Sequence, residues 1–158
     1  MTAIRFTVPG RPVTQGSKKH VGHGRMIEAN ERLRPWRDSI AWHARQAVPP
    51  GWNVFQPMSL DAVFLFPRPA SHLLKDGRLR RAAPPEMTSR RGGDLDKLLR
   101  ALCDALTQSG IWADDSQWIC GLVQKKYAPP GQPGGLECWI APVDQDNPHL
   151  PRRRTPCR

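Results

Sequence analysis

Proline and glycine are spread along the whole chain and limit the length of every regular element. The sequence of 158 residues contains 17 prolines and 13 glycines. Proline breaks helices and cannot donate to the hydrogen-bond ladder of a central strand, which argues against a long helical bundle or coiled coil. Six tryptophans and four phenylalanines lie in patterned segments, which argues against disorder. The sequence therefore predicts one domain with a single core built from short elements.

Hydrophobic periodicity predicts where these elements lie. Strands are expected at 3–8, 59–66, 117–127 and 136–141, with a hairpin return at 26–27. Helices are expected from near Leu33 to Ala47 and from Asp94 to Gln108, the second with a leucine stripe and a stop at Gly110. This order predicts an α+β domain over residues 1–142, in which two helices pack on one mixed sheet. Residues 143–158 are expected to form a basic, disordered tail.

Several classes of protein are excluded by what the sequence lacks. No window approaches the roughly 18 apolar residues of a spanning helix, which excludes a membrane protein. Arg5, Pro9 and Arg11 interrupt the start, so we expect no secretory signal and a cytoplasmic protein. The four cysteines form no C-x-x-C pair and are interpreted as reduced thiols. The sequence contains no phosphate-cradling glycine loop, and we expect no small organic cofactor.

The formal net charge of +10 is distributed unevenly. Residues 1–47 carry a net charge of +6 and the aperiodic segment 67–92 carries +5, whereas residues 93–142 carry −2. A basic surface is typical of a protein that binds a polyanion such as nucleic acid. We therefore expect residues 67–93 to form a mobile loop that contacts nucleic acid, the alternative being a solvated linker.

An acidic island inside this basic chain needs a separate explanation. It contains five aspartates and one glutamate, among them Asp94, Asp96 and Asp115. If Asp94 is an N-cap, its side chain can converge with that of Asp96, and a short turn would return Asp115 beside them. Three carboxylates on two elements would suit a hard cation such as Mg²⁺. The alternative is that Asp94 only caps the helix and that Asp114–Asp115 only makes a turn.

The segment Asp94–Trp118 resembles the signature of the RusA family of Holliday-junction resolvases; it reads DLDKLLRALCDALTQSGIWADDSQW. The signature has a D-x-D-N-x-x-K helix, a D-A-L element, a G-x-x-x-D-D-x-Q segment and a later strand with a lysine. Val8–Pro12 also resembles the family's first strand and turn, so the resemblance covers about residues 3–142. It implies a Mg²⁺-dependent endonuclease, with Mn²⁺ as a substitute, that acts as a homodimer on branched DNA and nicks a four-way junction symmetrically. Small chains of this kind commonly belong to phages or prophages, so the resemblance also implies such an origin.

The resemblance also implies roles for individual residues. Asp94, Asp96 and Asp115 match the metal-binding carboxylates, and Arg100 stands at the place of the active-site lysine. Lys125 matches the lysine of the later strand. The expected DNA-binding residues are Lys18, Lys19, Arg90, Arg91, Lys97 and Lys125. Asp104 and Asp114 also match family positions, and their roles stay open.

Two departures from the signature keep alternatives open. Lys97 stands where the family has asparagine, and Arg100 where it has lysine. Arginine keeps the charge and grips phosphate, but it cannot transfer a proton near neutral pH. If the family lysine transfers a proton, either this enzyme is impaired or Lys97 has taken over. The first alternative function is therefore a catalytically silent DNA-binding protein on the same fold, and the second is a Mg²⁺ enzyme that acts on nucleotides.

Overall fold

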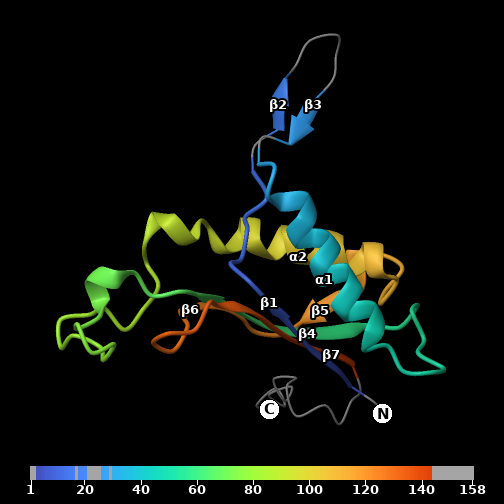
Figure 1. Ribbon diagram of the computed structural model, residues 1–158. Helices are drawn as coiled ribbons and strands as arrows, with labels where there is room; N and C mark the ends of the chain where they lie inside the picture. Colours follow the sequence, from blue (N-terminus) through green and yellow to red (C-terminus); the bar gives the residue numbers. More distant parts are fainter. Residues whose placement is uncertain (1–2, 17, 21–25, 29, 144–158) are drawn as a thin grey trace, which may run out of the picture.

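In a computed structural model of the chain, the core is a mixed β-sheet centred on strand β4 (Met58–Phe66; Figure 1). Strand β7 (Gly135–Pro142) lies antiparallel on one side of β4, and β1 (Ile4–Pro9) pairs antiparallel with β7 at the edge. On the other side, β5 (Trp118–Cys120) and β6 (Val123–Tyr127) both pair with β4 in parallel. The predicted α+β architecture with one mixed sheet and two helices is confirmed.

Two helices cover one face of the sheet (Figure 1). Helix α1 runs from Leu33 to Gln46 and α2 from Leu95 to Ser109, close to the predicted bounds. Gly110 ends α2 in a left-handed conformation (φ 77°), which glycine adopts without strain. Both helices place an apolar stripe against the sheet, and the largest of these core side chains are Trp36, Ile40, Leu98, Leu102 and Leu106.

Strand β1 alternates between the helix-covered face of the sheet and the opposite face. Ile4, Phe6 and Val8 are buried, and the residues between them are exposed. Successive side chains of a strand point to opposite faces, so alternate residues of β1 pack beneath the helices. The opposite face carries Arg5, whose guanidinium lies 4.7 Å from the ring centroid of Trp139.

The single strand predicted over 117–127 is wrong, because the segment forms two short strands. Gly121 interrupts it with a φ of 139°, and a side chain at this position would collide with the main-chain carbonyl of Leu60. At the break, the N–H of Leu122 donates to Asp61 Oδ1 (2.7 Å). Both short strands stay paired with β4, with a register shift where β5 pairs.

The segment between β4 and α2, which we expected to be a mobile loop, follows a path defined by its own contacts. Arg68 donates to the Pro84 carbonyl (2.9 Å), and its guanidinium lies 4.6 Å from the ring centroid of Tyr127. Arg80 donates to the Leu73 carbonyl (2.9 Å). These contacts stabilise the segment itself. The role of its basic residues in nucleic-acid binding stays a prediction.

The predicted hairpin is also present. Strands β2 (Lys18–His20) and β3 (Met26–Glu28) pair antiparallel and stand apart from the sheet and helices (Figure 1). The structure describes residues 3–16, 18–20, 26–28 and 30–143, so the side chains of Lys18 and Lys19 and the predicted tail from 144 onward lie outside this description. Over the described ranges, no helix has the length and apolar character needed to cross a membrane.

Candidate active site

The start of α2 places Asp94 and Lys97 side by side. Asp94 is the N-cap residue and has an extended backbone (φ −84°, ψ 141°), but its side chain makes no capping hydrogen bond. Asp94 Oδ2 instead lies 2.9 Å from the Lys97 ammonium. This contact, through hydrogen bonding first and charge second, lowers the pKa of Asp94 and raises the pKa of Lys97. The Asp94 carboxylate is therefore held by a cation and does not cap its own helix.

Lys125 reaches the same point from β6. Its ammonium donates to the Gly93 carbonyl (2.7 Å), and its charge adds a smaller contribution to the lowered pKa of Asp94. The charge of Asp96 likewise contributes to the raised pKa of Lys97. The structure thus brings four of the expected site residues together at the start of α2, two carboxylates and two ammonium groups.

Asp114 and Asp115 lie at a short 3-10 turn, η3 (Asp115–Gln117), and have different surroundings. Asp114 Oδ1 accepts a hydrogen bond from the Ser116 N–H (2.9 Å) and caps the turn. Hydrogen bonding by Ser116 also lowers the pKa of Asp114. The Asp115 carboxylate is exposed and makes no hydrogen bond or ion pair with the described residues. Asp114 therefore has the structural role of capping a turn, which was the alternative to metal binding. The Asp115 carboxylate remains available to a ligand.

Gln117 fixes this turn to the rest of the protein, and our reading of the sequence missed it. Its Oε1 accepts hydrogen bonds from the main-chain N–H groups of Ala113 (2.8 Å) and Asp114 (3.0 Å). Its Nε2 donates to the carbonyls of Val54 (2.7 Å) and Gln56 (3.0 Å). The available signal was the glutamine that ends the G-x-x-x-D-D-x-Q pattern.

Asp115 lies near the middle of α2. After burial, which is the largest cause, the charges of Asp115 and Asp104 help to raise the pKa of Cys103 to about 12. Cys103 follows Asp96 by about two helical turns. Within the described ranges, no three Asp, Glu, His or Cys side chains form a group that could hold a metal ion. The expected trio of Asp94, Asp96 and Asp115 is thus not gathered into one group, and metal binding stays a prediction.

Comparison with protein-family models decides the family. The model described as Endodeoxyribonuclease RusA matches residues 9–134, a span that contains α2, η3 and β6. The chain belongs to the RusA family. A search among curated proteins gives no match. The resemblance seen in the sequence is confirmed, and membership of the RusA family implies nuclease activity of the Holliday-junction resolvase type, on branched DNA.

The two departures from the RusA signature have different surroundings. Lys97 is paired with Asp94. Arg100 is exposed and forms no ion pair with any described residue. Asp104, which lies one turn after Arg100, pairs instead with Arg37 of α1, with 3.2 Å between Nη1 and Oδ2. Asp104 therefore ties the two helices together, and the guanidinium of Arg100 is available to a ligand.

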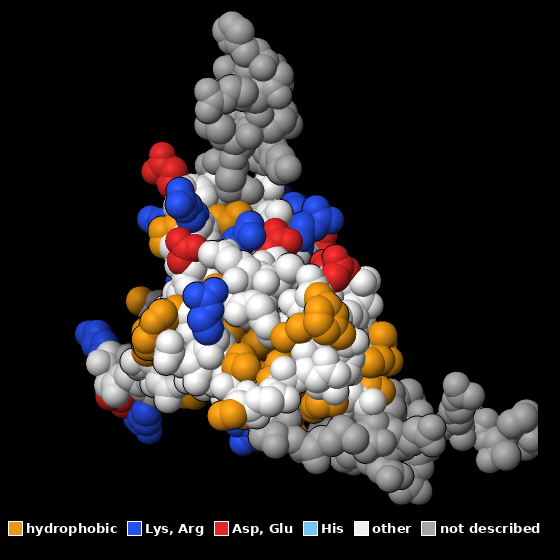
Figure 2. Space-filling view, turned by 90° about the vertical axis from the view of Figure 1, so that its right-hand side faces the viewer, with side chains coloured by type: hydrophobic (Ala, Val, Ile, Leu, Met, Phe, Trp, Pro, Cys, Tyr) orange, Lys and Arg blue, Asp and Glu red, His pale blue; other side chains and the backbone are white. Residues whose placement is uncertain are grey.

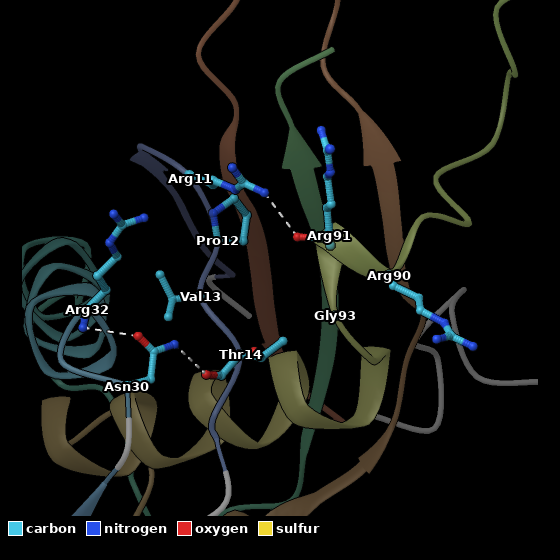
Figure 3. A pocket seen from close by; sticks show the side chains of 10 residues that line it. Arg11, Pro12, Val13, Thr14, Asn30, Arg32, Arg90, Arg91 and Gly93 are labelled. Atoms are coloured by element: carbon cyan, nitrogen blue, oxygen red, sulfur yellow. Dashed lines mark hydrogen bonds between the residues drawn. The ribbon is translucent and has the colours of Figure 1, made fainter. Parts of the chain in front are cut away.

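A cleft of about 390 Å³ opens beside the start of α2 (Figure 3). Its walls come from the segment after β1, the residues around the start of α1 and a 3-10 turn, η2 (Arg90–Gly92). Gly93 also lines the cleft and directly precedes Asp94, so the cleft adjoins the candidate site. Four arginines line it, namely Arg11, Arg32, Arg90 and Arg91. The sequence analysis predicts a DNA contact for the last two of these and makes no prediction for the first two.

Proposed function

We propose that this RusA-family protein is a Mg²⁺-dependent endonuclease that resolves four-way DNA junctions in the cytoplasm by paired, symmetric nicks. The observation that carries the proposal is the grouping of Asp94 and Asp96 with Lys97 and Lys125 at the start of α2. Carboxylates repel the phosphate backbone, so a protein that only bound DNA would gain nothing from them in a basic chain. A nuclease does gain from them, because they can hold the cation that its chemistry needs.

The carboxylates have the donor chemistry for a hard divalent cation. Asp96 and Asp115 make no hydrogen bond or ion pair with the described residues. The ion pair between Asp94 and Lys97 is exposed, and exposed pairs are weak and readily exchanged. Asp94, Asp96 and Asp115 would therefore hold Mg²⁺, or Mn²⁺ in its place, after side-chain rearrangement. A bound metal would activate a water molecule and neutralise charge on the phosphate.

The cationic side chains around these carboxylates have separate roles in the proposal. Arg100 lies one turn after Asp96 and stabilises negative charge on the reacting phosphate; it transfers no proton, because its guanidinium stays protonated. Lys97 releases Asp94 when a cation binds and then faces the phosphate. Lys125 keeps its hydrogen bond to the Gly93 carbonyl and fixes the start of α2.

Basic residues outside the carboxylate site would hold the DNA backbone. In the proposal, Lys18 and Lys19 bring charge from the β2–β3 hairpin, which stands apart from the body of the molecule and can reach along a DNA arm (Figure 1). Arg90 and Arg91 lie on η2, immediately before the site. Contacts of this kind position the substrate without reading its sequence. Binding should therefore depend strongly on salt and weakly on sequence.

A homodimer completes the proposal, because paired nicks need two active sites related by a two-fold axis. Large apolar side chains are exposed at Trp42, Phe55, Ile119 and Leu122. Figure 2 shows hydrophobic side chains gathered on the lower middle and right of one face, whereas most charged side chains lie above them or at the left edge. Exposed apolar surface of this kind is typical of a protein contact. Sedimentation tests the proposal, and a monomer both free and on junction DNA would contradict it.

The function is tested by nicking of a synthetic four-way junction and of a linear duplex, each with Mg²⁺ and with chelator. We expect paired nicks only in the junction and only with the metal. Asp96→Asn should abolish nicking and keep or tighten junction binding, because it removes a charge that repels phosphate. Glu137→Gln removes an exposed carboxylate from β7 and should leave both properties unchanged. Loss of binding together with nicking in Asp96→Asn would show that Asp96 is structural.

A catalytically silent DNA-binding protein on the RusA fold is the second candidate. The observation that favours it is the ion pair between Lys97 and Asp94, in which an ammonium already neutralises the Asp94 carboxylate. Metal binding without DNA separates the two candidates, and calorimetric titration with Mn²⁺ measures it. For the nuclease, Lys97→Asn should tighten Mn²⁺ binding and Asp94→Asn should weaken it. Equal affinities in the wild type and both variants would support the silent protein.

A further inference from the structure

The cleft beside the start of α2 concentrates positive charge. Among the described residues that line it, four are arginines and none is acidic. Among the described residues, none of these four guanidinium groups takes part in an ion pair. Like charges gathered in one cleft repel each other, and a bound anion removes that repulsion. The cleft is therefore built to receive an anion from outside the chain.

Three of the four arginines form one rim. Figure 3 shows the side chains of Arg11, Arg32 and Arg91 rising on the same side of the cleft, whereas Arg90 points away from them. Arg11 Nη2 donates to the Arg91 carbonyl (3.0 Å), which joins two segments that lie 80 residues apart. Arg11 is thereby held in place and still has other N–H groups to offer, since a guanidinium has five.

The cleft is also held at a fixed distance from the carboxylate site. The N–H of Gln15 donates to the carbonyl of Lys97 (3.1 Å), so the segment after β1 is bonded to the first turn of α2. Gly93 has a φ of 68°, and a side chain there would collide with Thr14. The two segments therefore touch where the cleft meets Asp94. Gly93 lines the cleft and Asp94 follows it directly, so the cleft adjoins the start of α2.

We propose that Arg11, Arg32 and Arg91 bind one backbone phosphate of the DNA strand that is cut, a phosphodiester flanking the scissile one. Guanidinium groups match the geometry of phosphate oxygens and bind them through paired charge-assisted hydrogen bonds. None of the described residues that line the cleft is aromatic, so we expect no base to stack there and the contact to read no sequence. This inference rests on the proposed function, because it places the bound phosphate in the same DNA strand as the phosphodiester bond that is cut.

Junction binding in chelator tests the inference without turnover. The first variant is Arg32→Gln, because the Arg32 side chain makes no hydrogen bond or ion pair with the described residues and its loss leaves the fold intact. The matched control is Arg5→Gln, which removes the same charge from the opposite face of the sheet. We expect about tenfold weaker binding for Arg32→Gln, the effect of one charge-assisted contact. We expect less than about a twofold change for Arg5→Gln, because a distant charge is screened by salt.

A second measurement locates the phosphate. Junctions with a single neutral methylphosphonate, placed in turn at each phosphate around the cut, are bound by the wild type and by the double variant Arg11→Gln/Arg32→Gln. At one flanking position, the methylphosphonate should weaken wild-type binding and should have no further effect on the double variant. The slope of log K against log salt should fall by about 0.9 in the double variant, which corresponds to one phosphate.

The outcomes separate this inference from the proposed function. Two results would overturn the phosphate site alone. One is an equal loss of junction affinity in Arg32→Gln and Arg5→Gln. The other is a methylphosphonate effect on binding that persists at every position in the double variant. A wild-type protein that binds the junction no better than linear duplex would overturn the proposed function as well. If Arg11→Gln unfolds the protein, the same methylphosphonate scan with Arg32→Gln alone decides the question.

Discussion

Replacing Gln117 by leucine should destabilise the protein more than replacing a polar side chain that makes a single exposed hydrogen bond. The leucine side chain has a similar volume but makes none of the four hydrogen bonds of Gln117. Each bond contributes about 0.5–1.5 kcal/mol net, and water can replace part of it at the exposed N–H groups. The free energy of unfolding should therefore fall by about 2–4 kcal/mol.

A more conservative substitution separates the two hydrogen bonds that Gln117 accepts from the two that it donates. Gln117→Glu keeps an oxygen that accepts from the N–H groups of Ala113 and Asp114 but loses both donors to Val54 and Gln56. A carboxylate facing two carbonyl oxygens is also repelled by them. About half of the leucine effect, roughly 1–2 kcal/mol, should remain. The loss lies in the anchor to the segment before β4, and the turn keeps its own bonds.

Urea unfolding followed by tryptophan fluorescence measures these changes, with an unchanged m-value as the sign that the unfolding transition is the same. Gln108→Leu is the matched control, because Gln108 makes one exposed hydrogen bond through its side chain, to Asp38 (3.1 Å). Its effect should stay below about 1 kcal/mol. A Gln117→Leu protein within about 0.5 kcal/mol of the wild type would refute the reasoning, because that is the range of ordinary surface substitutions.

Three further predictions concern groups in or near the site. Arg100→Lys should keep most nicking activity and Arg100→Ala should lose about 10²-fold in single-turnover assays, because only the charge is needed; a near-wild-type alanine variant would contradict this. The lowered pKa of Asp114 means that its carboxylate stabilises the fold at neutral pH and loses this effect as pH falls below about 4. The stability difference between the wild type and Asp114→Asn should therefore vanish in acid unfolding experiments. Because its pKa is raised to about 12, Cys103 should react with iodoacetamide at pH 8 far more slowly in the folded protein than in urea, as mass spectrometry can show.

The fold was predictable where a single local period decides the structure. The leucine stripe predicted the extent of α2 and Gly110 predicted its C-terminal end. Both signals are local, because burial of one helix face and a left-handed C-cap depend on residues close together in the sequence. The split between β5 and β6 was not predictable from such a period. It depends on Gly121, where a side chain would collide with the carbonyl of Leu60. Leu60 lies on the neighbouring strand β4, more than 50 residues away in the sequence. Short-range patterns carry no information about such an approach.

The candidate site was predictable as a set of residues but not as a set of contacts. From its position in the sequence, the Asp94 carboxylate could accept from a main-chain N–H in the first turn of α2 or pair with the Lys97 side chain. In the structure it pairs with Lys97. Spacing also offered Arg100 to Asp104 at i, i+4, but Arg37 from the other helix takes that carboxylate. In both cases two partners of equal local plausibility compete, and only the tertiary arrangement decides between them.

Two distant parts of the chain hold the backbone around Asp94. The carbonyl just before it, on Gly93, accepts from Lys125 of β6, and the carbonyl of Lys97 accepts from the N–H of Gln15 after β1. Both contacts use the main chain of the α2 start as acceptor, so they orient its backbone whatever the side chains there do. A change of the side chain at position 97 therefore alters the cation beside Asp94 without moving the helix. The same backbone can therefore carry the asparagine of the RusA signature or the lysine of this chain at position 97.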